Sequence, residues 1–340
     1  MAEHSNLQVQ LVRRPQGAPV AGDFRLVDAP MPVAGEGQVL LRNLYLSLDP
    51  YMRGRMNDST DSYAPPYALN APPGGGTVAR VVQSRVTGFV EGDLVLTSDA
   101  GWQTFAVSDG VGLRRLPDSM AQPSQALGVL GMTGFTAWWG LTAIGQPQAG
   151  ETLVVSAAAG AVGSVVGQVG RLLGCRVVGI AGGPDKCALV VEELGFDTCL
   201  DYQDPGLAGR LREAAPEGID IYFENVGGAV REAVWPLLND DARVPVCGLV
   251  AGYNGTADEA GGVHDLLMSL IVRRIRLQGF LNADHRDRFP EFLRRMQGWL
   301  DRGQLVAPET IVDGLEQAPD AFIGLFEGRN LGKLIVRIPE

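Results

Sequence analysis

Metal-binding side chains are scarce in this chain. Among its 340 residues only three are histidines: His4, His264 and His285. None of the four cysteines precedes residue 175, and they form no C-x-x-C pair: Cys175, Cys187, Cys199 and Cys247. A catalytic zinc site needs thiolate, imidazole or carboxylate ligands brought close together, and structural zinc sites are rich in cysteine. The composition therefore argues against zinc, and the cysteines are read as reduced thiols of a cytoplasmic protein rather than a disulfide framework.

Positive charge is also limited, since the formal net charge is -11 and the basic residues form no block. A protein that binds nucleic acid by neutralising phosphates is not expected from this balance. A local basic pocket for a small anion stays open. Only two of the basic residues are lysines, Lys186 and Lys333.

No targeting or membrane-spanning segment is expected. The first residues contain no apolar core of the kind found in secretory signals. Two stretches, 119–150 and 152–170, lack charged side chains, but Gly, Ser, Gln and Thr interrupt both of them. Pro123 and Pro147 also bracket the first stretch, which is more typical of buried core elements than of a membrane helix.

The pattern of apolar residues changes near the middle of the chain. Before about residue 115, short β-rich runs alternate with turn signals, namely VLLRNLYLSL, GGGTVARVVQS, DLVLTS and QTFAVS, as in a compact β domain. From Glu151 onward, apolar runs alternate with helical segments, which predicts βαβ units on a parallel sheet. Further strands are predicted in IDIYFENV, RVPVCGLV and IRLQGF, a helix over 286–302, and a terminal strand in GKLIVRI.

A phosphate-binding turn is predicted after the run TLVVS. Ala158, Gly160 and Gly163 occupy the three positions of a dinucleotide fingerprint, with alanine where the first glycine usually stands. The turn follows a strand, opens a helix and precedes a second strand within about 30 residues, as that motif requires. A tight strand-to-helix turn without a ligand is the alternative reading.

The end of the second strand of this unit bears on the cofactor. An NAD site usually carries an acid there for the ribose 2′-hydroxyl. The residues Ile180 to Gly183 include none, and Lys186 follows shortly afterwards. A cation at this place favours the 2′-phosphate of NADP(H), although Asp185 beside it is a counterargument. No G-x-S-x-G, H-E-x-x-H or P-loop motif is present, which leaves hydride transfer without metal.

Several longer segments resemble one known family. These are NLYLSLDPYMRGRM (43–56), GMTGFTAWWGL (131–141), AAAGAVGSVVGQVGRLLGC (157–175), FENVGG (223–228), CGLVAGYN (247–254), LQGF (277–280) and GRNLGK (328–333). Together they resemble the zinc-independent medium-chain dehydrogenases/reductases, in the branch of alkenal double-bond reductases, prostaglandin reductases and curcumin reductases.

The resemblance implies an α/β fold of two domains with the active site in a cleft between them. A GroES-like β-rich domain would comprise 1–127 and be completed by 305–340, and a Rossmann domain with a doubly wound parallel sheet would comprise 128–304. It also implies a homodimer and a small-molecule enone or enal substrate.

The resemblance also assigns site residues. The pyrophosphate would lie against Gly160, Ala161, Val162 and Gly163, and the 2′-phosphate end against Lys186 and Tyr202. The rest of NADP(H) would be contacted by Asn225, Cys247, Phe280 and Asn330, and the substrate by Tyr51 and Tyr253, with Pro50, Met132 and Thr136 as less secure additions. Relatives commonly carry serine where Gly183 stands, which puts the strength of the NADP preference in doubt.

Tyr253 is the predicted catalytic residue. Hydride delivered to the β-carbon of an enone moves negative charge onto the carbonyl oxygen, and a phenol O–H can stabilise that charge. With a reference pKa of about 10, the phenol serves better as a donor than as a base at neutral pH. A tyrosine that only caps a loop after the CGLV strand is the structural alternative.

The predicted function is NADPH-dependent reduction of the carbon–carbon double bond of α,β-unsaturated aldehydes and ketones. A quinone reductase of the same superfamily and a noncatalytic dinucleotide-binding protein stay open as alternatives. Trp138 and Trp139 are predicted to pack in the core or between the domains rather than to form a stacking platform, and Cys247 to contribute backbone rather than a thiolate. Arg53 and Arg55 could brace the cleft or be solvated.

Overall fold

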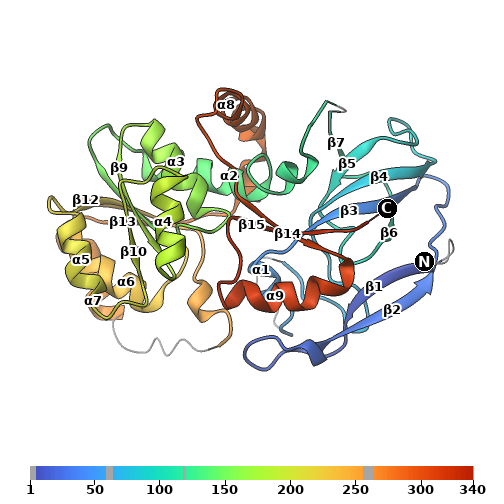
Figure 1. Cartoon of the computed structure of the whole chain (residues 1–340), viewed down its shortest axis with the longest axis horizontal. Helices are drawn as coiled ribbons and strands as arrows, with labels where there is room; N and C mark the ends of the chain where they lie inside the picture. The colour runs from blue at the N-terminus through green and yellow to red at the C-terminus, as the bar shows by residue number, and fades with distance from the viewer. Residues whose placement is uncertain (1–4, 59–63, 118, 256–262, 340) are drawn as a thin grey trace. The chain divides into compact units, whose positions relative to one another are not determined.

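The computed structural model describes residues 5–58, 64–117, 119–255 and 263–339. The chain divides into two compact units (Figure 1). The first contains residues 1–127 and 309–340, and the second contains residues 128–308. No helix in the described part of the chain is long and apolar enough to cross a membrane.

The first unit is built mainly of strands. Its larger sheet has the order β14-β15-β3-β4-β5-β7, with β6 also paired to β3, and β1 pairs with β2 in a separate antiparallel ribbon. The strands are β1 (Ser5–Leu11), β2 (Phe24–Pro30), β3 (Val39–Ser47), β4 (Thr77–Ser84), β5 (Leu94–Thr97), β6 (Phe105–Ser108), β7 (Arg114–Arg115), β14 (Glu309–Asp313) and β15 (Lys333–Arg337). The four strands predicted in the first 115 residues are confirmed as β3 to β6.

The C-terminal strand completes the sheet of the first unit. β15 pairs antiparallel with β3, placing Val336 opposite Leu46, and parallel with β14. Two α-helices, α1 (Tyr51–Arg55) and α9 (Ala318–Phe326), and the short helices η1 (Ala21–Asp23), η2 (Pro123–Leu127) and η7 (Leu315–Gln317) belong to this unit. Phe322 of α9 contacts Trp102 edge-on, and Trp102 stacks on Phe24. These buried rings fix α9 against the first unit's core.

The second unit is a parallel sheet with helices. Within the described residues its strand order is β10-β9-β8-β11-β12-β13, with all pairings parallel. Numbered from β8 as first strand, this is the order 3-2-1-4-5-6 of a Rossmann sheet, which confirms the predicted fold class. The strands are β8 (Thr152–Ser156), β9 (Arg176–Ala181), β10 (Thr198–Asp201), β11 (Ile219–Phe223), β12 (Leu238–Val246) and β13 (Arg276–Gly279).

The helices of the second unit connect its strands. Helix α3 packs on β8 and β9 closely at Gly170, where a Cβ would lie 2.4 Å from the Leu153 side chain and 3.4 Å from that of Val177. The α-helices are α2 (Met132–Trp139), α3 (Gly163–Leu172), α4 (Pro184–Glu192), α5 (Leu207–Ala214), α6 (Gly228–Val234), α7 (Val263–Arg273) and α8 (Phe289–Asp301). The short helices are η3 (Gly140–Gly145, π-helical), η4 (Trp235–Leu237), η5 (Val250–Gly252) and η6 (Asn282–Arg288).

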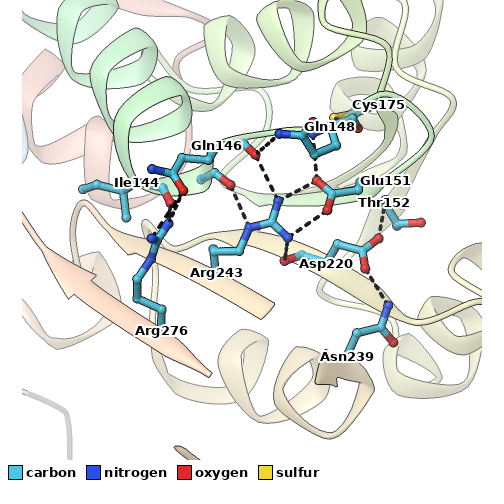
Figure 2. A network of polar contacts seen from close by, with 11 residues as sticks. Ile144, Gln146, Gln148, Glu151, Thr152, Cys175, Asp220, Asn239, Arg243 and Arg276 are labelled. Carbon is cyan, nitrogen blue, oxygen red and sulfur yellow. Dashed lines mark hydrogen bonds and ion pairs between the residues drawn. The ribbon is translucent and has the colours of Figure 1, made fainter. Parts of the chain in front are cut away.

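A polar network around Arg243 holds the amino-terminal ends of β8 and β11, as Figure 2 shows. Arg243 of β12 donates to both carboxylate oxygens of Glu151, at 2.9 and 2.5 Å, and to the carbonyl oxygen of Gly145 at 2.9 Å. Asp220 accepts from the backbone N–H of Thr152 at 2.9 Å. The network therefore links the starts of β8 and β11 to Arg243, which lies inside β12.

Candidate functional site

The carboxyl ends of β8 and β11 form the natural ligand site of the second unit. These two strands are neighbours in the sheet, and the chain leaves them toward opposite sides of the strand order. In open parallel sheets, ligands bind at such a switch point, outside the carboxyl ends of the strands. The loop after β8 and the FENVGG segment after β11 both begin there.

The turn after β8 is shaped for a phosphate. Ala157 has φ +50°, a left-handed conformation that is uncommon outside glycine, and the chain then enters α3 at Gly163. A Cβ on Gly163 would lie 2.2 Å from the carbonyl oxygen of Ala157, so only glycine fits there. The N–H groups of Ser164 and Val165 bond to the carbonyls of Gly160 and Val162 at 3.0 and 3.1 Å, so the attraction for an anion comes mainly from the positive end of the α3 dipole. These residues fit the pyrophosphate of a dinucleotide.

Ala158 explains the departure from three glycines in the fingerprint. Its side chain is fully buried and points toward β9, where a Cβ on Gly179 would lie 2.9 Å from that of Ala158. The methyl group of Ala158 is therefore accommodated by a glycine on the neighbouring strand. The missing glycine of the motif does not argue against phosphate binding.

Two buried side chains join the loops that follow β8 and β11. The Ser156 hydroxyl donates to Glu224 Oε1 at 3.2 Å and accepts from the backbone N–H of Asn225 at 2.8 Å. Glu224 Oε1 also accepts from the backbone N–H groups of Val226 and Gly227, at 2.7 and 3.0 Å. Asn225 returns a side-chain hydrogen bond to the Ser156 carbonyl at 2.8 Å. This arrangement fixes both the backbone and the side-chain direction of Asn225.

The loop after β12 is tied to the same place. The backbone N–H of Cys247 donates to the Glu224 carbonyl at 2.9 Å, and those of Val250 and Ala251 donate to the carbonyls of Asn225 and Val226 at 3.2 and 3.0 Å. Desolvation and the Glu224 carboxylate raise the pKa of the Cys247 thiol to about 12. Cys247 is therefore a neutral thiol at physiological pH, as its predicted backbone role requires.

Tyr253 follows this turn directly. Its hydroxyl is close to the backbone, since a Cβ on Gly248 would lie 3.1 Å from it. Desolvation raises the pKa of Tyr253, while the hydrogen bond from the Leu249 backbone opposes that rise. The phenol therefore keeps its proton near neutral pH and can act as a hydrogen-bond donor.

At the ends of β9 and β10 lie the residues predicted to contact the 2′-phosphate end. The Tyr202 ring lies against the backbone of Gly182, where a Cβ would come within 2.8 Å of the ring. Lys186 is in the first turn of α4, and burial lowers the pKa of its ammonium group. Asp201 accepts from the N–H groups of Gly183 and Gln203 at 2.9 and 3.0 Å, and these bonds lower its pKa.

Gly183 has φ +86°, which a side chain rarely adopts. A serine at this position would be strained in this backbone. The Asp201 carboxylate bonds to the same backbone position, so this turn is held without a hydroxyl.

Phe280 follows β13, at the same edge of the sheet as Asn225. A Cβ on Gly140 would lie 2.6 Å from the Phe280 ring and 2.9 Å from the Phe223 ring, so the two rings meet over this glycine. Nearby, the Asn282 side chain donates to the Thr136 hydroxyl at 2.8 Å.

Trp138 is buried against Phe135 and Phe292, as predicted for a core residue. Trp139 is only partly buried and lies against His285, with ring centroids 4.3 Å apart. Met132, at the start of α2, is exposed.

Three predicted site residues belong to the first unit. Pro50 is the N-cap of α1 and Tyr51 is its first residue. Asn330 lies in the loop before β15. Arg53 is buried and donates to the carbonyl of Gly17 at 2.7 Å, and Arg55 lies over the Tyr67 ring. Both arginines therefore brace the first unit.

The polar cluster of Ser156 and Glu224 was not singled out from the sequence. The signal that could have indicated it is a glutamate directly after a buried strand, with two glycines, Gly227 and Gly228, shortly afterwards. Glu224 is almost completely buried, and its Oε2 has no hydrogen-bond partner within the described residues.

Two family models match the chain. One, described as the N-terminal domain of oxidoreductase, matches residues 7–116, and the other, described as zinc-binding dehydrogenase, matches residues 161–298. Within residues 5–58, 64–117, 119–255 and 263–339, no group of three or more His, Cys, Asp or Glu side chains could hold a metal ion.

Known proteins resemble the chain over nearly its whole length. An NADPH-dependent curcumin reductase of Escherichia coli (strain K12) is 53% identical, covering 96% of this chain and 95% of that protein. A 2-alkenal reductase (NADP(+)-dependent) of Nicotiana tabacum is 40% identical, covering 99% of both. The crystal structure of CurA in complex with NADPH from Vibrio vulnificus has 49% identity and a TM-score of 0.95, covering 98% of this chain and 99% of that one.

Proposed function

Because the chain belongs to the zinc-independent branch of the medium-chain dehydrogenase/reductase superfamily, we propose that it reduces the carbon–carbon double bond of α,β-unsaturated aldehydes and ketones with NADPH. The observation that carries the proposal is the Tyr253 hydroxyl. This hydroxyl is a neutral donor, and its turn is bonded through the backbone to Asn225 and Val226, in the loop that Ser156 joins to the end of β8. The relatives named above support the same reaction class.

The proposed NADPH site uses residues that follow the carboxyl ends of the Rossmann strands, together with Asn330 of the first unit. Gly160, Ala161, Val162 and Gly163 bind the pyrophosphate through the backbone and the helix dipole of α3. Lys186 and Tyr202 bind the 2′-phosphate end, because a cation there is attracted to the additional charge. The remaining contacts are assigned to Asn225, Cys247, Phe280 and Asn330.

NADPH, when bound, would supply the hydride. The part of this chain in the reaction is then to stabilise the negative charge that develops on the substrate carbonyl oxygen. Tyr253 does this by donating its O–H, and since its pKa is raised, the proton stays on the phenol through the neutral range. Tyr51 is proposed as a further substrate contact.

The assay follows NADPH consumption by the purified protein with a panel of enones, enals and quinones. The proposal expects faster turnover of the enones and enals. Faster turnover of quinones would favour the quinone reductase alternative. NADPH binding without consumption by any of them would favour the noncatalytic alternative.

Tyr253→Phe separates the chemical role from a structural one. Removal of one donor to a developing oxyanion costs on the order of a hundredfold in kcat. Tyr45→Phe, on β3 of the first unit, is the matched control and is expected to keep the wild-type kcat. An unchanged kcat in Tyr253→Phe would remove this residue from the mechanism.

We also propose a cytoplasmic homodimer. The cysteines are free, as in a reducing compartment. At the edge of the second sheet, β13 has one strand neighbour and exposes Leu277, while Leu267, Met268, Ile271 and Val272 of α7 are also exposed. Analytical ultracentrifugation tests the dimer, and Ile271→Lys is expected to shift it toward monomer.

A further inference from the structure

The first unit contains a charged side chain where charge is rarely found. Lys333, the first residue of β15, is only 3% exposed, and Asp49 is equally buried. Lysine and aspartate are almost never fully buried unless they are paired. Their Nζ and Oδ1 atoms lie 3.1 Å apart. This ion pair is separate from the proposed contacts with cofactor and substrate.

The polar atoms around the pair are satisfied. The Lys333 ammonium donates to the carbonyl oxygens of Leu48 and Leu334, at 2.8 and 2.9 Å, in addition to Asp49. All three of its N–H donors are therefore used. The other oxygen of Asp49 accepts from the buried Ser47 hydroxyl. A buried network in which each member is satisfied is rigid and specifies one arrangement.

The pair joins two segments that are far apart in sequence. Asp49 lies two residues before Tyr51, the proposed substrate contact, with only Pro50 between them. Lys333 lies three residues after Asn330, the proposed cofactor contact, whose side chain donates to the Gly332 carbonyl at 3.0 Å. The pair thus connects the end of β3 with the start of β15.

We propose that Lys333 and Asp49 are positioning residues, which fix the segments of Tyr51 and Asn330 relative to each other. The proposal rests on the proposed function, because that function gives Tyr51 and Asn330 their roles. Neither charged side chain is assigned a contact with NADPH or substrate. The backbone already joins these segments through the Ile335/Ser47 pairing and the bond from the Leu48 N–H to the Leu334 carbonyl at 3.2 Å, and the ion pair adds a buried side-chain contact to this connection.

A buried ion pair could also serve only to stabilise the fold. The test must therefore measure a binding constant in addition to stability. Buried pairs can often be replaced by apolar side chains of similar size without loss of stability, whereas removal of one partner is strongly destabilising. Glu309, opposite Lys333 in the β14/β15 register, is a second carboxylate near the ammonium. Loss of Lys333 alone would leave both carboxylates without it, so Asp49→Asn is the gentler single change.

The experiment compares Asp49→Asn and the double variant Asp49→Leu/Lys333→Met with the wild type. It measures the melting temperature, the NADPH Kd by fluorescence titration, and the KM for an enone. Arg337→Met is the matched control, because Arg337 lies on β15 like Lys333 and pairs with Asp313 of β14 at 2.7 Å, but is exposed. The control is expected to keep both constants.

The proposal expects the double variant to be folded and yet to show both a weaker NADPH Kd and a higher enone KM, each by about tenfold or more, since displacement by about 1 Å can cost a hundredfold. Asp49→Asn is expected to change both constants in the same direction. A folded double variant with the wild-type Kd and KM would overturn the proposal, even if Asp49→Asn fails to fold.

The NADPH titration does not depend on turnover. If the wild type binds NADPH but reduces no enone, the proposed function fails, while the Kd still tests the positioning role through Asn330. If the wild type reduces enones and the double variant keeps both constants, only the positioning role fails.

Discussion

Gly163→Ala tests the dinucleotide turn at a single atom. The added Cβ would lie 2.2 Å from the Ala157 carbonyl oxygen and 2.8 Å from its carbonyl carbon, and real Cβ atoms essentially never come within 3.0 Å of such neighbours. The turn or the start of α3 must therefore move by about 0.8 Å, the difference between 3.0 and 2.2 Å. Both obstructing atoms are backbone, so no side-chain rotation relieves the contact.

The size of the effect follows from the bonds this movement breaks. A hydrogen bond to a charged group contributes about 1.5–3 kcal/mol, so the loss of two such bonds to a phosphate costs roughly 3–6 kcal/mol. We expect the NADPH Kd to rise at least about a hundredfold. The steric overlap also costs about 1–3 kcal/mol of the free energy of unfolding.

The assay is a fluorescence titration with NADPH, together with a thermal melt. Gly209→Ala in α5 is the control, because its Cβ would meet nothing within 4 Å and its φ is not positive. It should keep the wild-type Kd and gain about 0.4–1 kcal/mol of stability. If folded Gly163→Ala binds NADPH as tightly as the wild type, the phosphate does not lie on this turn.

Three further outcomes are expected. Lys186→Met should raise the NADPH Kd roughly tenfold to a hundredfold and leave the NADH Kd unchanged, since only the 2′-phosphate interacts with the ammonium group; equal losses for both cofactors would contradict this. Because the pKa of Tyr253 is raised and its active form is protonated, kcat should not fall on account of this residue until the pH exceeds about 10, and a fall near pH 8 in a pH–rate profile would count against the donor role. Arg243→Met should lower the free energy of unfolding by about 2 kcal/mol in urea titrations. Desolvation raises the pKa of Glu151, but its hydrogen bonds to Arg243 and Gln148 lower it on balance. The contribution of the pair to the free energy of unfolding should therefore be complete above about pH 5 and be lost as the pH falls through the lowered pKa of Glu151. If the free energy of unfolding of the variant falls with acid as steeply as that of the wild type, this reasoning is refuted.

The Rossmann unit was the part of the fold that the sequence predicted best. The apolar runs TLVVS and RVVGIA are buried almost throughout, and unbroken apolar runs are typical of parallel strands covered on both faces. Strands β11 and β13 and helix α8 also lie within their predicted segments, whereas β12 begins at Leu238, before the predicted segment RVPVCGLV that starts at Arg243. These elements could be predicted because each is marked by a local pattern of apolar residues, which does not depend on residues far away in the sequence.

The first unit was harder to predict in detail. The β1/β2 ribbon was not predicted, because β2 exposes most of its residues and has no continuous apolar run. The ion pair of Lys333 and Asp49 joins residues that are distant in sequence, and a lysine looks the same in a sequence whether it is buried or solvated. The cluster of Ser156 and Glu224 was missed for the same reason, since its bonds form only once β8 and β11 are neighbours.

The reaction itself is tested most directly with NADPH carrying deuterium at the transferred position of the nicotinamide ring. After turnover with an enone, mass spectrometry and NMR locate the label in the product. The account predicts deuterium on the former β-carbon of a saturated ketone. Deuterium on the carbonyl carbon of an allylic alcohol would contradict it.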